Sequence, residues 1–298
     1  MTVIELAAGS ARATVAPAGA EARSWRAAGR DLLWPGDPAI WPDVSPILYP
    51  VVGWTRDGAR VAGRSYALGL HGFARFETFA VEAAGPDFVR LVLADNERTR
   101  AVYPFAFAFA VEYRLTEDAL GVALEIENPG GEDAPYACGL HPGFRWPFGD
   151  EGRDGAFVRF EKPERGEVPL IAPGGLIGGA RKPVPMNGRD LPLGDALFAG
   201  DALCFLDCTS RSLAFHDASG GSIVMEFPDF QHAALWTRPG APFLCLEAWT
   251  GYSDPDGFAG DLSEKPSMRA LAPGGRARHA ARYVYRPARS PQSRRTIG

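Results

Sequence analysis

The stretch Phe105-Ala106-Phe107-Ala108-Phe109-Ala110-Val111-Glu112-Tyr113 alternates large apolar side chains with small or polar ones. Successive side chains of an extended strand point to opposite faces, so the three phenylalanines share one face with Val111 and Tyr113. The alanines and Glu112 share the other face. Large side chains on one side and small ones on the other predict a strand that lies between two packed sheet layers.

The same period continues after a short turn. Leu120, Val122, Leu124 and Ile126 again recur at every second position, beyond the turn Thr116-Glu117-Asp118, and Asn128-Pro129-Gly130-Gly131 ends the run. This turn chemistry predicts an antiparallel pair of strands.

Similar short runs recur along the chain, separated by the 35 glycines and 26 prolines, and no internal repeat is evident. No stretch has a helical period long enough for a helix, so 21–28 and 37–41 are expected to form single turns at most. The Pro/Gly-rich interval 161–193 is expected to form long connections. Many short strands predict an all-β sandwich or barrel. The further strands are expected at 88–93, 202–206, 212–215, 223–227, 233–236, 243–246 and 280–285.

Composition excludes several classes of protein. A net charge of -5 and a pI near 5.6 argue against nucleic-acid binding, which depends on clustered Lys and Arg. The start, 1–15, lacks a secretory pattern, and the most apolar run, 102–111, is too short to span a membrane. We therefore expect a cytoplasmic protein without a membrane partner. We expect one β-sandwich catalytic domain over 1–285 and a disordered basic tail over 286–298.

Four cysteines, Cys138, Cys204, Cys208 and Cys245, lie in apolar surroundings, which favours buried, reduced thiols over disulfides. Cys204 and Cys208 have the even spacing of residues on one face of a strand, and no second close Cys or His pair follows them. Packing is therefore a better interpretation of these two residues than a zinc site.

Three segments suggest acid–base chemistry. They are Leu70-His71-Gly72-Phe73-Ala74-Arg75, Gly139-Leu140-His141-Pro142-Gly143-Phe144 and Phe243-Leu244-Cys245-Leu246-Glu247-Ala248-Trp249. Histidine titrates near neutrality, and a carboxylate among apolar neighbours has its pKa raised toward the same range. Glu247 is the only charged residue in 241–252, where an ionised group is costly without a partner or a purpose.

These segments, in this order, resemble the aldose 1-epimerase (galactose mutarotase) family over roughly residues 40–285. The similarity is greatest to its bacterial members with HGFAR, HP-aromatic and Glu-x-Trp segments. Ser45-Pro46-Ile47-Leu48-Tyr49-Pro50 and Gly200-Asp201-Ala202-Leu203 add to the resemblance. It implies a large twisted sandwich of two antiparallel sheets, the galactose mutarotase-like supersandwich. It also implies a small-molecule sugar as the substrate and no cofactor or metal; the protein is expected to be a monomer or homodimer.

By resemblance, Glu247 is the general base, His141 is the general acid, His71 binds near the ring oxygen and Asp201 binds the sugar. This assignment predicts a bell-shaped pH profile, with Glu247 on the acid limb and His141 on the alkaline limb. The chain departs from the common family pattern at Ala248, where proline usually follows the glutamate, and at Gly143, where a larger residue is frequent.

The remaining site candidates come from side-chain chemistry. Arg75 could donate paired hydrogen bonds to sugar hydroxyls. Trp236, Trp249 and Phe144 could carry the apolar face of a pyranose.

Each candidate has a structural alternative. Glu247 could pair with an arginine at a strand end, and either histidine could anchor loop backbone. Arg75 could pair with Glu77 or another carboxylate. Asp201 could serve an N-terminal turn, and the aromatic residues could belong to the core. His216, His232 and His279 are interpreted as surface or structural residues.

Three rival functions remain open from sequence. A hexose 6-phosphate epimerase would need clustered cations for the phosphate, for which Arg75 alone is thin support. A binding module would not need an acid opposite a base. A glycoside hydrolase would need two facing carboxylates, of which Glu247 with Asp201 or Asp254 are the nearest candidates.

Overall fold

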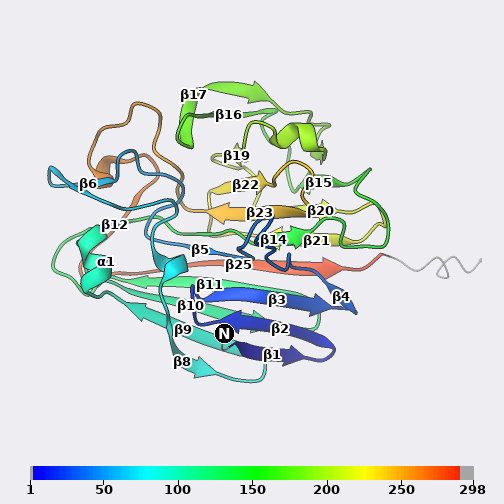
Figure 1. Ribbon diagram of the computed structural model, residues 1–298, viewed down its shortest axis with the longest axis horizontal. Helices are drawn as coiled ribbons and strands as arrows, with labels where there is room; N and C mark the ends of the chain where they lie inside the picture. The colour runs from blue at the N-terminus through cyan, green and yellow to red at the C-terminus, as the bar shows by residue number, and fades with distance from the viewer. Residues whose placement is uncertain (1–2, 289–298) are drawn as a thin grey trace, which may run out of the picture.

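The computed structural model describes residues 3–288, and its strands build an all-β fold of antiparallel sheets, as predicted. The largest sheet has nine strands, with the C-terminal strand near its centre (Figure 1). In spatial order these strands are β18 (Asp190–Pro192), β15 (Phe157–Phe160), β20 (Ser212–His216), β21 (Ser222–Glu226), β25 (Arg276–Arg286), β11 (Ala119–Glu127), β10 (Ala108–Leu115), β9 (Phe88–Ala94) and β8 (Ala80–Ala84).

Two smaller sheets form the second layer. Strands β1 to β4 lie over β9 and β10, while β22 and β23 lie further along the molecule, near β20 and β21 (Figure 1). The four-stranded sheet contains β1 (Ile4–Ala8), β2 (Ala11–Ala16), β3 (Glu21–Ala27) and β4 (Arg30–Asp31). The six-stranded sheet runs in the order β19 (Leu203–Phe205), β22 (His232–Trp236), β23 (Phe243–Trp249), β13 (Gly139–Leu140) and β5 (Ile47–Leu48), with β14 (Gly143–Arg145) also paired to β23.

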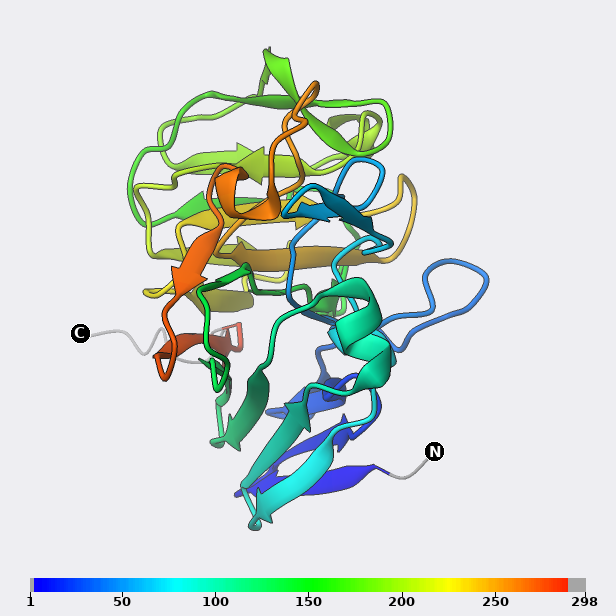
Figure 2. The same cartoon turned by 90° about the vertical axis from the view of Figure 1, so that its left-hand side faces the viewer.

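Short hairpins and turns of helix lie outside the large sheets, and the helix of residues 97–102 stands at the ends of β9 and β10, which it connects (Figure 2). The two-stranded pairs are β16 (Glu167–Ala172) with β17 (Leu176–Pro183), β6 (Ala59–Val61) with β7 (Arg64–Tyr66), and β12 (Ala134–Tyr136) with β24 (Arg269–Leu271). The helical segments are η1 (Ala74–Phe76), α1 (Glu97–Val102), η2 (Asp195–Phe198) and η3 (Leu262–Glu264).

The core forms between the two layers, where apolar area is removed from water. Strand β10 confirms the alternation predicted for it, because Phe109 and Tyr113 are 0% and 1% exposed. Ala108 and Glu112 on its other face remain partly exposed. The turn 116–118 joins β10 to β11 in antiparallel register, also as predicted. A single cluster of buried side chains includes residues from Leu6 to Tyr285 and therefore joins both layers.

Three expectations about secondary structure were wrong. Interval 161–193 contains β16, β17 and β18, because a register shift between Pro169 and Ile171 interrupts the alternation that would have revealed a strand. Segment 21–28 is largely strand β3, which is paired on both sides. The missed helix α1 has only six residues, too few for a period, and begins at a capping box formed by Asn96 and Thr99.

All four cysteines are free and buried, as predicted. Cys204 lies in β19, but Cys208 follows the end of this strand, so the expectation of a shared strand face was wrong. Of the helices within residues 3–288, none is both long and apolar enough to cross a bilayer. The expectation that a disordered tail starts at 286 was wrong for Arg286 itself, because this residue belongs to β25. The rest of that tail, 289–298, lies outside the described residues.

Candidate active site

Strand β23 supplies the central side chain of the site. Its residues alternate between the core, which receives Leu244, Leu246 and Ala248, and the opposite face of the six-stranded sheet. That opposite face carries Phe243, Cys245, Glu247 and Trp249 by the same period of two. Glu247 therefore projects away from the core, onto the face that the hairpins and loops surround.

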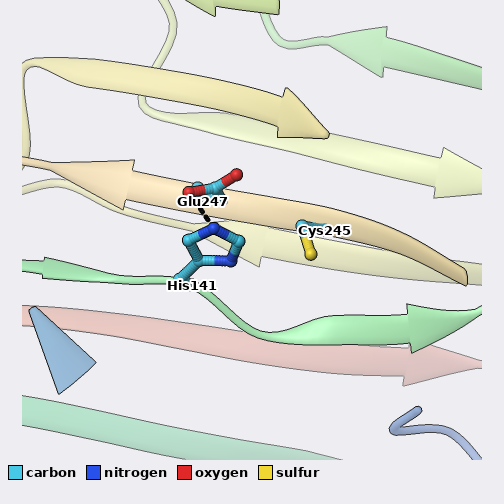
Figure 3. Close-up of side chains that lie close together, drawn as sticks. All are labelled: His141, Cys245 and Glu247. Atoms are coloured by element: carbon cyan, nitrogen blue, oxygen red, sulfur yellow. Dashed lines mark ion pairs between the residues drawn. The ribbon is translucent and has the colours of Figure 1, made fainter. Parts of the chain in front are cut away.

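Strand register places His141 beside Glu247. Leu140 in β13 is opposite Ala248, and Gly143 in β14 is opposite Cys245. Both short strands therefore have the same register against β23, which places His141, between them, opposite Glu247. Pro142 has no N–H and interrupts the ladder, although its carbonyl still accepts a hydrogen bond from Leu246 N. His141 is consequently the next neighbour of Glu247, with Nε2 3.2 Å from Oε2 (Figure 3).

Both members of this pair are buried but keep hydrogen-bonding capacity. Glu247 is 1% exposed and His141 is 9% exposed. Apart from the ion-pair contact of Oε2 with His141 Nε2, neither Glu247 Oε2 nor His141 Nδ1 has a hydrogen-bond partner among the described residues. Buried polar atoms are nearly always satisfied, so unpaired ones at the base of a cleft point to a polar ligand. The strand-end alternative for Glu247 is not observed, because within residues 3–288 its ion-pair partner is His141 and not an arginine.

Burial moves the pKa values of the pair in opposite directions. Desolvation raises the pKa of Glu247 well above its ordinary value, and the nearby charge of Asp201 raises it further. Desolvation also lowers the pKa of His141 to about 3, with a smaller contribution from Arg75. A protonated glutamate beside a neutral histidine is thus favoured in the free protein, and the pair keeps one proton over a wide pH range.

His71 is held in one tautomer by the backbone. Its Nδ1 accepts a hydrogen bond of 3.0 Å from Gly53 N, and the backbone N–H of His71 donates to Gly53 O. Burial first, and then the charge of His141, lowers the pKa of His71, so the ring is neutral and carries its proton on Nε2. His71 can therefore anchor the loop through Nδ1 and still bind near the ring oxygen of a sugar, because Nε2–H remains as a donor.

The backbone around His71 has an unusual conformation. His71 itself has a φ of 61°, in a region that non-glycine residues rarely adopt. At Gly72, a Cβ would meet the carbonyl oxygen of Tyr49 at 2.2 Å, so only glycine allows this close approach. Asp201, another candidate residue, also has a positive φ, of 80°. Such conformations cluster at functional sites because the surrounding structure must hold them.

All six predicted site residues line one cavity of about 440 Å³ on the outer face of the six-stranded sheet, here called the catalytic cleft. They are His71, Arg75, His141, Asp201, Trp236 and Glu247. The cleft brings together residues from four separate parts of the sequence. Sequence reasoning missed Trp41, Asp43, Trp54, Arg238 and Ser253, which also line it. Of these, Trp41 and Asp43 stand directly before the segment 45–50 already singled out.

The charged residues of the cleft have specific partners. Arg75 pairs with Asp43, whereas Glu77, the partner considered from sequence, pairs with Arg98. Asp201 accepts a hydrogen bond of 2.7 Å from Ala202 N through Oδ1. Asp201 therefore serves a local turn and also lines the cleft.

Aromatic side chains form much of the cleft wall. Trp236 and Trp249 line it, but Phe144 is 0% exposed and packs against Trp25 in the core, so Phe144 was wrongly considered as a sugar platform. Trp41 stacks on Phe243 with ring centroids 5.1 Å apart.

The two departures from the family pattern have structural explanations. A Cβ on Gly143 would lie 2.7 Å from the Trp41 ring, so this tryptophan fills the space of the missing side chain. Ala248 is fully buried and faces the core, away from the cleft.

His141, Cys245 and Glu247 offer nitrogen, sulfur and oxygen atoms that all lie within 4.8 Å of one another (Figure 3). Such a set is chemically suited to zinc. Burial and then the charge of Glu247 raise the pKa of the Cys245 thiol well above its ordinary value. Because a thiol must ionise to ligate zinc, these surroundings disfavour the metal. The absence of a metal remains a prediction.

The chain is similar to known proteins in both sequence and fold. A sequence model of the aldose 1-epimerase family matches residues 2–283. The chain is 30% identical over 258 residues to the chromosomal protein LacX of Lactococcus lactis subsp. lactis, which covers 82% of the chain and 86% of that relative. Its fold is similar to a galactose mutarotase related enzyme from Lactobacillus acidophilus, with a TM-score of 0.89, 26% identity and coverage of 96% and 98%. A galactose mutarotase-like protein from Lactobacillus casei is equally similar, with a TM-score of 0.89, 26% identity and coverage of 96% and 100%.

Proposed function

The chain belongs to the aldose 1-epimerase family, and from that premise we propose that it interconverts the α and β anomers of a free aldose by acid–base ring opening. The observation that carries the proposal is the contact between His141 Nε2 and Glu247 Oε2, 3.2 Å apart in the catalytic cleft. The anomeric hydroxyl oxygen and the ring oxygen are bonded to the same carbon. An acid and a base that serve these two oxygens must therefore be close neighbours.

The reaction proceeds by two proton transfers, from the form of the pair in which its one proton is on His141 and Glu247 is ionised. Glu247 takes the proton of the anomeric hydroxyl, the electron pair forms the C1 carbonyl, and the bond from C1 to the ring oxygen breaks. His141 delivers its proton to the ring oxygen. Rotation about C1–C2 presents the other carbonyl face, and the same two transfers in reverse close the ring. The enzyme returns to its starting protonation state, so no further reactant is consumed.

The other residues bind the sugar. His71 donates from Nε2 toward the ring oxygen and stabilises the negative charge that develops there. Asp201 accepts from sugar hydroxyls, and Arg75 donates to them while Asp43 holds its guanidinium. Trp236 and Trp249 face the apolar side of the pyranose.

The charges of the cleft favour a neutral sugar over a hexose 6-phosphate. Two arginines, Arg75 and Arg238, line it beside two aspartates, Asp43 and Asp201, and Arg75 is already paired with Asp43. A phosphate dianion would therefore enter a cleft without an excess of cations, at a cost in electrostatic energy. Asp254 is not placed to act as the second carboxylate of a glycoside hydrolase, because it pairs with Lys265 at 3.1 Å and does not line the cleft.

Polarimetry tests the proposal. Freshly dissolved α-glucose, α-galactose and a panel of pentoses are followed with and without catalytic amounts of protein, and at least one sugar should equilibrate faster than in buffer. His141→Asn should reduce the acceleration by roughly a hundredfold to ten-thousandfold. His216→Asn serves as the matched control, because His216 stacks on Phe157 and does not line the cleft. Acceleration of a hexose 6-phosphate alone would favour the phosphate-sugar epimerase. Binding without acceleration would favour a carbohydrate-binding protein.

A further inference from the structure

We propose that the protein has a second sugar subsite, built around Trp54, which binds the non-reducing residue of a disaccharide while its reducing residue occupies the catalytic cleft. This inference rests on the proposed function and extends it to the class of substrate. Its starting point is a second cavity of about 670 Å³, here called the outer cleft, lined by Trp54, Arg56, Asp57, Leu68 and Leu176 among others. Trp54 lines both cavities and therefore stands where they meet.

Trp54 is an exposed aromatic residue on a rigid support. It is 40% exposed, whereas a tryptophan without a ligand usually buries its large apolar surface. Its backbone N–H donates to Ser253 Oγ at 3.0 Å, and its backbone carbonyl accepts from Asp254 N at 2.8 Å. At Gly175, with a φ of 74°, a Cβ would lie 2.4 Å from the indole, so glycine is required for the hairpin to pack against the ring.

The position of Trp54 relative to the catalytic residues sets the direction in which a bound disaccharide runs. Trp236 in β22 is opposite Cys245, two residues before Glu247. Ser253, six residues after Glu247, accepts the hydrogen bond from Trp54 N. Glu247 therefore lies between Trp236 and Trp54. His71 is bonded to Gly53, the residue next to Trp54. In the proposed pose C1 lies at Glu247 and the ring oxygen at His71, so the ring continues from that oxygen to C5 on the side of Gly53 and Trp54. A second sugar attached through O6, which C5 carries by way of C6, or through O4 on the neighbouring C4 then extends toward the outer cleft.

The outer cleft offers the chemistry that a second sugar needs. The indole of Trp54 provides a platform for the apolar face of a pyranose, and the half-exposed Arg56 and exposed Asp57 provide a donor and acceptors for hydroxyl groups. Arg56 lines the outer cleft but not the catalytic cleft. Its side chain therefore distinguishes the two subsites experimentally.

The test compares anomer exchange at equilibrium, measured by exchange NMR, for glucose, maltose, isomaltose and the 2-linked disaccharide kojibiose. We expect maltose or isomaltose to have a lower KM than glucose, and kojibiose, whose linkage lies on the other side of the ring, to gain nothing. Trp54→Ala should raise the KM of the favoured disaccharide relative to that of glucose by roughly three- to tenfold. Arg56→Ala should shift the same ratio in the same direction.

Leu170→Ala is the matched control, because Leu170 is an equally exposed apolar residue, at 42%, that lines neither cleft. The inference is overturned if maltose and isomaltose have no KM advantage while glucose is turned over. It is also overturned if Trp54→Ala changes the KM of glucose and disaccharide equally, since Trp54 would then only support the catalytic cleft. If glucose itself is not accelerated, the proposed function fails first, so the two failures are distinguishable.

Discussion

Replacing Glu247 by glutamine tests the assignment of the general base and its structural alternative together. Glutamine keeps the shape of the side chain but cannot accept the anomeric proton. Loss of a proton-transfer group slows turnover by roughly a hundredfold to ten-thousandfold, or about 3–5 kcal/mol of transition-state stabilisation. We expect a loss in this range in the polarimetric rate. Glu112→Gln is the control, because Glu112 lies in β10, outside the cleft, and is partly exposed.

The stability of the same variant separates catalysis from structure. Glu247 is 1% exposed and, within the described chain, is not paired with an arginine, so its charge contributes little to holding the strands together. Burial raises the pKa of Glu247 in the folded state above its unfolded value. The stability gained from the neutral carboxyl is therefore fully present below the unfolded pKa and is lost as pH rises through the folded pKa.

Glutamine does not ionise, so Glu247→Gln should avoid that loss. At acidic pH the melting temperature of the variant should lie within roughly 2–4 °C of the wild type. With rising pH it should fall less steeply. Thermal unfolding followed by circular dichroism over a pH series measures both effects. A variant that unfolds, or that retains mutarotation, would refute the assignment of Glu247 as the base.

The pH profile of the wild-type rate should be bell-shaped, but with the limbs exchanged relative to the sequence expectation. Because burial raises the pKa of Glu247 and lowers that of His141 to about 3, protonation of His141 should set the acid limb and loss of the proton from Glu247 the alkaline limb. In His141→Asn the residual rate needs only an ionised Glu247, so it should rise with pH through the pKa of Glu247 and lose the alkaline limb; retention of the alkaline limb would contradict this order. Arg75→Ala and Asp201→Ala should raise KM more than they lower kcat, since both groups hold the sugar in ground and transition states alike; unchanged KM values would remove them from the site. Dialysis against a chelator should leave the rate unchanged, and a loss restored by zinc would contradict a metal-free mechanism.

Local alternation made nine of the 25 strands within residues 3–288 predictable from sequence, six of them in the nine-stranded sheet. In β10, β11 and β23 the apolar period of two follows from burial of one face, and this signal is present within a few residues. It disappears where local geometry breaks the period, as at the register shift of β16. It is also absent where an element is too short, as in α1. These elements depend on contacts that a local pattern does not contain.

Sequence alone could likewise identify Glu247, because a single carboxylate in an apolar strand is costly without a purpose. The order of the segments around His71, His141 and Glu247 supplied their expected roles by resemblance. Sequence could not show that Arg75 pairs with Asp43, since these residues are 32 positions apart and meet only through the tertiary fold.

Only the tertiary structure decided the environment of the acid and the base. The register of β13 and β14 against β23 brings His141 to Glu247, and the surrounding loops remove both from water. The directions of their pKa shifts follow from that burial, which is why the order of the two pKa values differs from the one assumed from sequence. The position of Trp54 at the junction of two clefts is also a tertiary property, because Ser253 and Gly175, which hold it there, are distant in the chain. Sequence determines which chemical groups are available, but their protonation and reach depend on solvent exclusion and on contacts between distant segments.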